Sequence, residues 1–174
     1  GYPRGEFNLK RGAFGAEPWT EHMRKELEDN LGIKAYDIYG LSEIAGPGVG
    51  YECEFQHGTH LNEDYYYPEI VDPKTSEPLP EGQLGELCFT HLTKEGMPLL
   101  RYRTHDLTAL HYDKCSCGRT FVRMDRILGR CDDMLIIRGV NVFPTQIEAV
   151  ILSLKEFEPH YQLTVGRENN TDTM

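Results

Sequence analysis

The sequence contains no long hydrophobic run and no segment rich in basic residues. Its longest apolar runs, such as Met134–Ile137 and Ala149–Leu152, are far shorter than the ~20 residues that span a bilayer. Lys and Arg together number 18 against 28 Asp and Glu, giving a formal net charge of −10, and such an acidic surface repels a phosphate backbone. We therefore expect neither a membrane-spanning segment nor a nucleic-acid partner.

Targeting signals and disulfide frameworks are also missing from the printed sequence. No basic segment followed by an apolar one opens the chain, and residue 1 is Gly rather than Met, so position 1 need not be the natural start. The cysteines are few and odd in number, which favours a reducing compartment and metal binding by some of them. They are Cys53, Cys88, Cys115, Cys117 and Cys131. These features predict a cytoplasmic protein.

The first part of the chain predicts one helix and one strand. The pattern of residues 18–27 predicts a helix, with Pro18 in its first turn and Gly32 at its C-terminal end. The apolar residues that follow predict a short buried strand that runs into a turn at Gly40–Glu43. Gly46–Gly50 is expected to be a glycine-rich turn, and it lacks the spacing of a dinucleotide-binding loop.

The middle of the chain has a β-rich pattern. Short strands are predicted over 69–71, 84–90 and 107–112, separated by turns that contain Pro and Gly. This pattern is typical of an antiparallel sheet or a small barrel.

The last part of the chain predicts a small α/β unit. Its predicted elements are a strand over 134–137, a turn at Arg138-Gly139, a helix from Pro144 to Leu154 and a strand over 160–165. We therefore expect a mixed α/β (α+β) fold in two parts, residues 1–131 and 132–174, the second of which stops before it closes a core.

Four motifs in a fixed order carry a resemblance to a known family. They are Gly15-Ala16-Glu17-Pro18-Trp19, Tyr39-Gly40-Leu41-Ser42-Glu43, Tyr102-Arg103-Thr104-His105-Asp106, and the block from Gly129 to Pro144. In this order they resemble the adenylate-forming acyl-CoA synthetases, and within that family the phenylacetate-CoA ligase group. The resemblance implies a ligase that converts an aryl acid and MgATP to an acyl-adenylate, then transfers the acyl group to coenzyme A and releases AMP.

The second and third motifs receive their roles from this resemblance. Attack on the α-phosphate builds charge on oxygen atoms, which requires a divalent cation, a carboxylate that holds it and hydroxyl donors. By resemblance Glu43 holds Mg²⁺ and Ser42 contacts the phosphate. Tyr39 would stack on the adenine, and Asp106 would accept hydrogen bonds from both ribose hydroxyls. Arg130 would add a contact on the ribose side.

The first and last motifs also receive roles by resemblance. Gly15, Ala16 and Glu17 would lie along the adenine, where small residues let the backbone come close. Asp132 would be the hinge about which a small C-terminal lid rotates between the two half-reactions. Gly139 would then line the path of the pantetheine thiol, where a side chain would obstruct it.

Each of these residues has a plainer interpretation when it is taken alone. Tyr39 is then typical of a core aromatic, Glu43 of a surface carboxylate and Asp132-Asp133 of a solvated turn. Arg101 and Arg103 either bind phosphate or pair with the excess acid, and the second interpretation is favoured. Only the joint order and spacing favours the family roles.

A set of Cys and His residues forms a second signal. Cys115 and Cys117 share a tight turn, and Cys53 lies upstream with His57 or His60. Three sulfurs and one imidazole form a closed tetrahedral zinc set with no position open for catalysis. The alternative is a group of reduced, partly buried thiols, since Cys-x-Cys is a weaker signature than Cys-x-x-Cys. By resemblance to zinc-binding members of the phenylacetate-CoA ligase group we favour structural zinc, with His60 as the fourth ligand.

Two elements that the family's mechanism needs do not occur in the sequence. No Ser/Thr/Gly-rich phosphate loop followed by Lys is present, and no catalytic Lys precedes the end at Met174. We therefore expect a fragment that is inactive by itself, with 1–131 as the C-terminal portion of the large AMP-binding domain. Residues 132–174 would be the hinge and the start of a C-terminal lid. His105 stands where the family commonly has Gly or Arg, so the sequence does not determine the conformation of the turn at this position.

Three functions are compatible with these patterns. The first is an aryl-acid CoA ligase that uses phenylacetate or a related acid, ATP, Mg²⁺ and coenzyme A, as a monomer or a homodimer. The second is a non-catalytic, zinc-stabilised binding module. The third is an adenylating enzyme that passes its acyl group to another acceptor.

Overall fold

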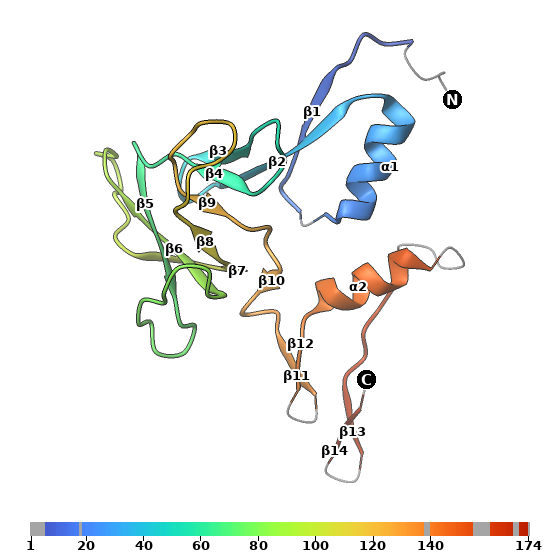
Figure 1. The fold of residues 1–174 in the computed structure, drawn as a ribbon. Coiled ribbons are helices and arrows are strands. Elements are labelled where there is room, and N and C mark those ends of the chain that lie inside the picture. Colours follow the sequence, from blue (N-terminus) through green and yellow to red (C-terminus); the bar gives the residue numbers. More distant parts are fainter. Residues whose placement is uncertain (1–5, 18, 138–139, 155–160, 169–170, 174) are drawn as a thin grey trace.

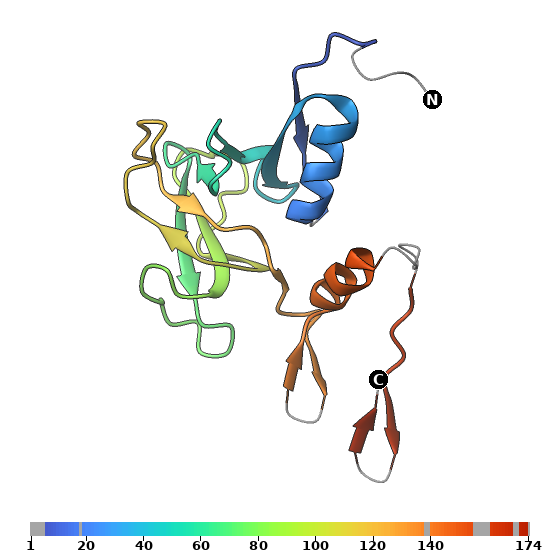
Figure 2. The same cartoon turned by 45° about the vertical axis from the view of Figure 1, so that its right-hand side comes forward.

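The computed structural model describes residues 6–17, 19–137, 140–154, 161–168 and 171–173. Figure 1 shows a sheet-rich body with helix α1 (Glu21–Leu31) on one side and a smaller C-terminal part that contains helix α2 (Pro144–Ser153). Figure 2 shows the same separation after rotation, with the C-terminal part projecting from the body. The mixture of helices and sheets agrees with the predicted fold class.

The N-terminal segment forms a strand-helix-strand unit. Strand β1 (Arg11–Phe14) pairs in parallel with strand β2 (Lys34–Leu41), and α1 connects the two. The sequence did not predict β1, because its four residues are mostly polar or small. A Cβ atom at Gly15 would lie 2.2 Å from the carbonyl oxygen of Ile38, so only glycine lets the chain after β1 approach β2 this closely.

Helix α1 begins later than the sequence predicted. It starts at Glu21 instead of residue 18, because the Thr20 side chain accepts a hydrogen bond from the Met23 N–H at 3.2 Å and caps the first turn. Gly32 ends the helix as predicted, with a φ of 69° that suits glycine. Pro18 lies outside the described residues.

The first sheet has six strands in the order β1-β2-β3-β4-β9-β8. The further members are β3 (Gly46–Glu52), β4 (Thr59–Leu61), β8 (Leu110–His111) and β9 (Arg123–Met124). Gly46–Gly50 is therefore part of a strand, and its prediction as a turn was wrong. A Cβ at Gly40 would lie 2.1 Å from the Gly46 carbonyl oxygen, so glycine at position 40 permits the close pairing of β2 with β3.

The second sheet is antiparallel, which confirms the prediction for the middle of the chain. Its order is β10-β7-β6-β5. The strands are β5 (Tyr66–Val71), β6 (Gly85–His91), β7 (Tyr102–Thr108) and β10 (Gly129–Arg130). The strand predicted over 107–112 is in fact the end of β7 and the whole of β8, which belong to different sheets. The motif at Tyr102–Asp106 accordingly lies in a strand.

Buried side chains from both sheets form one hydrophobic core. The buried members are Ile44, Val49, Leu61, Tyr66, Ile70, Leu87, Phe89, Leu110, Val122 and Met124. Tyr39 and Tyr102 are partly buried and pack against this core. Tyr39 of the second motif and Tyr102 of the third are therefore anchored by packing against the core.

The C-terminal part consists of two hairpins and α2. Its strands are β11 (Leu135–Ile137), β12 (Val140–Val142), β13 (Gly166–Glu168) and β14 (Thr171–Thr173). The helix predicted from Pro144 ends at Ser153, and Leu154 is its C-cap. The strand predicted over 160–165 was wrong, because residues 161–165 form no regular element and β13 begins at Gly166. Among the described residues, no helix is long and apolar enough to cross a membrane.

Candidate nucleotide site and candidate metal centre

A cavity of about 240 Å³ lies where the segment that follows β1 meets residues of β2, β7, β9 and β10. It brings together six residues that the resemblance assigned to the nucleotide. They are Gly15, Ala16, Glu17, Tyr39, Asp106 and Arg130. These residues come from four separate segments of the chain, so strand pairing, rather than sequence proximity, creates the cavity.

Tyr39 and Asp106 contact each other directly in this cavity. The Tyr39 hydroxyl donates a hydrogen bond to Asp106 Oδ2 at 2.6 Å, and Arg130 Nη1 lies 3.7 Å from Asp106 Oδ1. The Tyr39 ring also stacks on Phe89, with the centroids 6.3 Å apart. One carboxylate oxygen of Asp106 is thus already engaged, and the other lies next to the Arg130 guanidinium.

Burial changes the acid-base behaviour of this pair. Burial raises the pKa of Asp106 above its ordinary value of 3.8, although the hydrogen bond from Tyr39 and the charge of Arg130 act in the opposite direction. Burial and the nearby Asp106 carboxylate also raise the pKa of Tyr39, so its hydroxyl stays protonated and remains a donor.

We expect Asp106→Asn to raise the melting temperature more at pH 7 than at about pH 4, near the ordinary Asp pKa. Because the pKa of Asp106 is raised on folding, the folded state holds this proton more tightly than the unfolded chain. The carboxyl therefore favours folding below its unfolded pKa and loses that contribution as the pH rises through its folded pKa. Thermal unfolding of both proteins at a series of pH values checks this. A difference in melting temperature between mutant and wild type that does not change with pH would contradict it.

Ser42 and Glu43 lie in the turn that follows β2, and both are exposed. Neither is among the described residues that line the cavity. The Glu43 backbone carbonyl accepts a hydrogen bond from Lys94 Nζ at 3.4 Å. The carboxylate assigned to Mg²⁺ therefore stands in the turn just beyond the cavity-lining residues Gly40 and Leu41.

Asp132 follows β10 and is exposed. Arg130 Nε and Nη2 donate hydrogen bonds to its two carboxylate oxygens at 2.9 Å and 2.8 Å. These bonds hold the pKa of Asp132 below its ordinary value. Arg130 thus connects the proposed ribose contact Asp106 to the proposed hinge. Gly139, assigned to the thiol path, lies outside the described residues.

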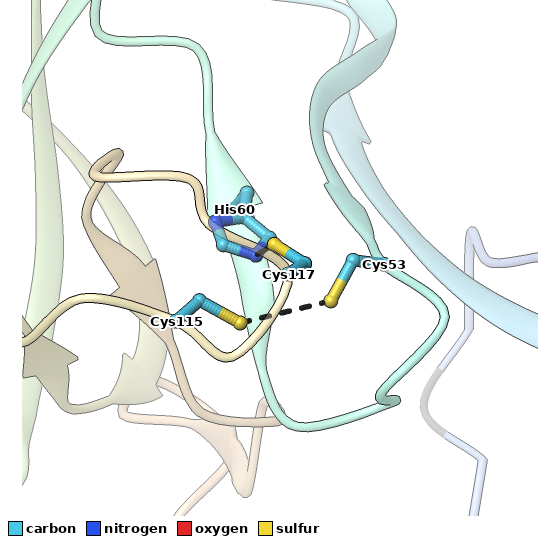
Figure 3. A group of neighbouring side chains, drawn as sticks. All are labelled: Cys53, His60, Cys115 and Cys117. Carbon is cyan, nitrogen blue, oxygen red and sulfur yellow. Dashed lines mark hydrogen bonds between the residues drawn. The ribbon is translucent and has the colours of Figure 1, made fainter.

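Four predicted metal ligands come together near β3 and β4 (Figure 3). Cys53 follows β3, His60 is in β4, and Cys115 and Cys117 are in the loop between β8 and β9. The ligand atoms all lie within 4.8 Å of one another. The Cys53 and Cys115 sulfurs are 3.8 Å apart, and Cys117 Sγ is 3.6 Å from His60 Nε2.

These distances fit a tetrahedral zinc ion. Bonds of about 2.3 Å to sulfur and about 2.0 Å to nitrogen place two sulfurs about 3.8 Å apart, and a sulfur and a nitrogen about 3.5 Å apart. His57 is not part of the group, and its ring nitrogen Nδ1 lies 3.4 Å from Arg123 Nη1. His60, the histidine that the sequence analysis favoured, is the one that lies with the three cysteines.

The surroundings shift the pKa values of Cys53, Cys117 and His60 in this group. Burial raises the pKa of the Cys53 thiol to about 11. Burial also acts to raise the pKa of Cys117, but hydrogen bonds from Arg119 and from the Cys115 and Cys53 thiols together outweigh it and lower that pKa to about 7. Burial lowers the pKa of His60, which favours the neutral imidazole that a metal requires. The chemistry of this donor set therefore fits zinc.

Several cavity residues were not singled out in the sequence. The Trp19 indole N–H donates to Asp37 Oδ1 at 3.0 Å, and both residues line the cavity together with Arg126. The guanidinium groups of Arg24 and Arg126 each lie 5.0 Å from the centre of the Trp19 ring. The only sequence signal for these cavity residues was that Trp19 belongs to the first motif.

Arg101 and Arg103 pair with acidic residues, which confirms the favoured interpretation. Arg101 Nε lies 3.3 Å from Glu69 Oε2, and Arg103 Nε donates to Glu86 Oε2 at 2.9 Å. Neither arginine is among the described residues that line the cavity.

Comparison with known proteins gives two independent sequence matches. A family model described as the AMP-binding enzyme C-terminal domain matches residues 139–174. Phenylacetate-coenzyme A ligase of Thermus thermophilus is 61% identical over 168 residues. That alignment covers 96% of this chain and 38% of the Thermus protein, so the chain spans well under half of its relative.

Solved structures agree with the sequence matches. 2-Hydroxyisobutyryl-CoA ligase in the postadenylation state, in complex with 2-HIB-AMP, gives a TM-score of 0.79 at 31% identity, covering 87% of this chain and 33% of that chain. The same ligase in the thioesterification state, with 2-HIB-AMP and CoA, gives a TM-score of 0.68 at 31% identity, covering 94% and 35%. The chain therefore belongs to the adenylate-forming acyl-CoA synthetases, as a segment similar to the C-terminal part of the phenylacetate-CoA ligases.

Proposed function

We propose that this chain is part of an acid-CoA ligase that activates phenylacetate or a related aryl acid with MgATP and transfers the acyl group to coenzyme A. The observation that carries the proposal is the cavity in which Tyr39, Asp106 and Arg130 meet the Gly15–Glu17 segment. The 61% identity to a phenylacetate-CoA ligase supports the choice of an aryl acid.

In this proposal the cavity holds the adenosine part of the nucleotide. Gly15, Ala16 and Glu17 lie along the adenine, and the Tyr39 ring offers it an aromatic face. Asp106 accepts hydrogen bonds from the ribose hydroxyls, with Oδ1 as the oxygen that Tyr39 leaves free. The positive charge of Arg130 compensates the partly buried Asp106 carboxylate.

The phosphate end of the nucleotide would lie at the turn after β2. Ser42 would donate its hydroxyl to the phosphate, and Glu43 would hold Mg²⁺, whose charge offsets the charge that develops on the phosphate oxygens. Both side chains are exposed at the turn and follow directly after cavity residues, so the nucleotide would run from the cavity toward solvent along β2.

The boundary between the two parts would lie at Asp132. We propose that residues 1–131 complete the large AMP-binding domain, and that 132–174 contain the hinge and the start of the lid. The related ligase has been solved in both a postadenylation and a thioesterification state, which supports a change of domain orientation between the two half-reactions. After that change Gly139 would line the thiol path.

Asp132→Pro is expected to spare adenylation and to stop thioester formation in the complete polypeptide that contains residues 1–174. Proline fixes φ near −65° and prevents the backbone change that a hinge requires. Pyrophosphate exchange and CoA thioester formation, measured separately, check this. Asp132→Ala is the matched control, because it also removes the Arg130 hydrogen bonds but leaves the backbone free. An equal loss of both half-reactions would argue against a hinge.

We further propose that Cys53, His60, Cys115 and Cys117 hold a structural zinc ion. The group joins the end of β3, strand β4 and the β8–β9 loop, which are otherwise linked by short strand pairings. All four positions around the ion would be filled by protein, so the ion would stabilise the fold and take no part in the reaction.

The experiment that tests the proposed function is phenylacetate-dependent exchange of labelled pyrophosphate into ATP by the complete polypeptide, with a fatty acid as control. Exchange with phenylacetate, followed by CoA-dependent thioester formation, is the expected result. Exchange without CoA-dependent product would indicate a different acyl acceptor. No exchange with any acid of a panel would overturn the proposal and favour a non-catalytic binding module.

A further inference from the structure

A second group of metal-ligating side chains lies in the four-stranded sheet, outside the described residues that line the cavity. Its members are Glu86, His105 and Cys131, whose ligand atoms all lie within 4.8 Å of one another. His105 Nδ1 is 3.1 Å from Glu86 Oε1 and 3.5 Å from Cys131 Sγ. A zinc ion bound to all three would place nitrogen and oxygen about 3.3 Å apart, and nitrogen and sulfur about 3.5 Å apart. The two distances from His105 Nδ1 are thus close to those of a tetrahedral site, and the Glu86 and Cys131 atoms lie within 4.8 Å of each other.

Strand register builds this arrangement. Arg130 lies opposite Asp106 in the β10–β7 pairing, so the next residue, Cys131, comes opposite His105. The Cys131 N–H donates to the His105 carbonyl oxygen at 2.8 Å and fixes the two residues side by side. Glu86 reaches them from β6, next to an irregularity in its pairing with β7. Two of the ligands, Glu86 and His105, lie on neighbouring strands and Cys131 directly follows a third, and positions on strands are held more firmly than positions on loops.

The buried carboxylate is oriented for an ion. Glu86 is fully buried, and Arg103 binds its Oε2 through Nε and Nη2. This leaves Oε1 to face His105. Oε1 also accepts a hydrogen bond from the His105 backbone N–H at 3.1 Å. Metal-binding carboxylates are commonly held in this way by a second partner. The Arg103 charge also compensates Glu86 while no ion is bound.

His105 adopts a backbone conformation that directs its ring into the group. Its φ is 67°, a region in which residues other than glycine are uncommon. The hydrogen bonds to Glu86 and from Cys131 hold this conformation. The His105 side chain is 45% exposed, so solvent can reach the group, whereas Cys53, His60 and Cys115 are buried.

We propose that Glu86, His105 and Cys131 form a second, exchangeable site for a zinc-like divalent ion. Glu86 Oε1, His105 Nδ1 and Cys131 Sγ would provide three ligands, and water would fill the fourth position. Cys131 would bind as the thiolate and release its proton to solvent. A thiolate with an imidazole favours zinc or cobalt over magnesium or calcium. An ion at this site would tie the segment that leads into the C-terminal part to β7.

The test is a metal titration of the complete polypeptide with its first zinc equivalent bound. Added Co²⁺ is followed by its sulfur-to-cobalt charge-transfer absorption, and the melting temperature is recorded with and without excess Zn²⁺. His105→Asn is the main variant, because Asn tolerates a positive φ and removes only the imidazole. Cys131→Ser is the second variant. His111→Asn and Cys88→Ala are the controls, since His111 lies in an exposed group with Glu81 and Asp113, and Cys88 lies in β6 outside any such group.

We expect the wild-type chain and both controls to bind a second equivalent of Co²⁺ with a charge-transfer band and to gain thermal stability with Zn²⁺. His105→Asn and Cys131→Ser should lose the band and weaken binding by more than the ~10–100-fold that loss of a supporting residue costs. The proposal would be overturned if the wild type bound no second equivalent of Co²⁺. It would also be overturned if His111→Asn lost the charge-transfer band and His105→Asn kept it. These readouts do not depend on ligase activity, so a failure of the proposed function would be seen separately, in pyrophosphate exchange.

Discussion

Replacing both Cys115 and Cys117 by Ser is expected to remove the tightly bound zinc and lower the melting temperature by roughly 8–16 °C. A ligand present at about 1,000 times its Kd stabilises the folded state by about 4 kcal/mol. For a domain of this size each kcal/mol corresponds to about 2–4 °C. The loss follows from the geometry, because two of the four ligands that join β3, β4 and the β8–β9 loop would disappear. Zinc content by mass spectrometry and thermal unfolding of the complete polypeptide check it.

The controls for this experiment separate a structural ion from a catalytic one. Cys88→Ala also removes a buried thiol but lies outside the cluster, so it should keep the full zinc content. His57→Asn should do the same, since His57 contacts Arg123 and not the sulfurs. Unchanged zinc content in the double variant would refute the site. Complete loss of turnover at low temperature, with the fold and stability intact, would refute its structural role.

Replacing Asp106 by Ala is expected to lower kcat/KM for ATP by about 100-fold or more. Each hydrogen bond to a charged acceptor contributes about 1.5–3 kcal/mol, so losing both ribose contacts removes roughly 3 kcal/mol or more. The Ala variant also leaves the Tyr39 hydroxyl without its acceptor at 2.6 Å. Steady-state kinetics with ATP as the varied substrate measure the effect.

Two further variants decide what Asp106 contributes. Tyr39→Phe removes the hydroxyl that donates to Asp106 but keeps the aromatic face, so it should have a much smaller effect on ATP use. Asp125→Asn changes an exposed carboxylate that pairs with His111, and it should leave ATP kinetics unchanged. Unchanged ATP kinetics in Asp106→Ala would remove the ribose assignment.

The order of motifs along the sequence was sufficient to identify the family. Residue types at fixed spacing also predicted the C-terminal end of α1 and the start of α2, because capping by glycine and helix initiation by proline are local effects. The antiparallel sheet was predicted for the same reason, since turns rich in Pro and Gly separate short β-branched runs.

Predictions were wrong where distant pairing decided the conformation. Gly46–Gly50 has the composition of a turn, but pairing with β2 and β4 makes it a strand. Strand β1 was not predicted, because its only support is parallel pairing with β2 across a helix. Pro18 suggested that the helix begins at residue 18. The helix begins at Glu21 instead, because the Thr20 side chain caps it by accepting a hydrogen bond from the Met23 N–H.

The sequence by itself determined the family, most of the element types and the chemical identity of the ligand groups. Only the tertiary structure decided that His60, and not His57, joins the three cysteines, and that Tyr39 touches Asp106 across 67 positions of the chain. It also brought Cys131 close to His105 and Glu86. The physical reason is that spacing along the chain fixes only local backbone geometry, whereas strand register and core packing fix which distant side chains meet.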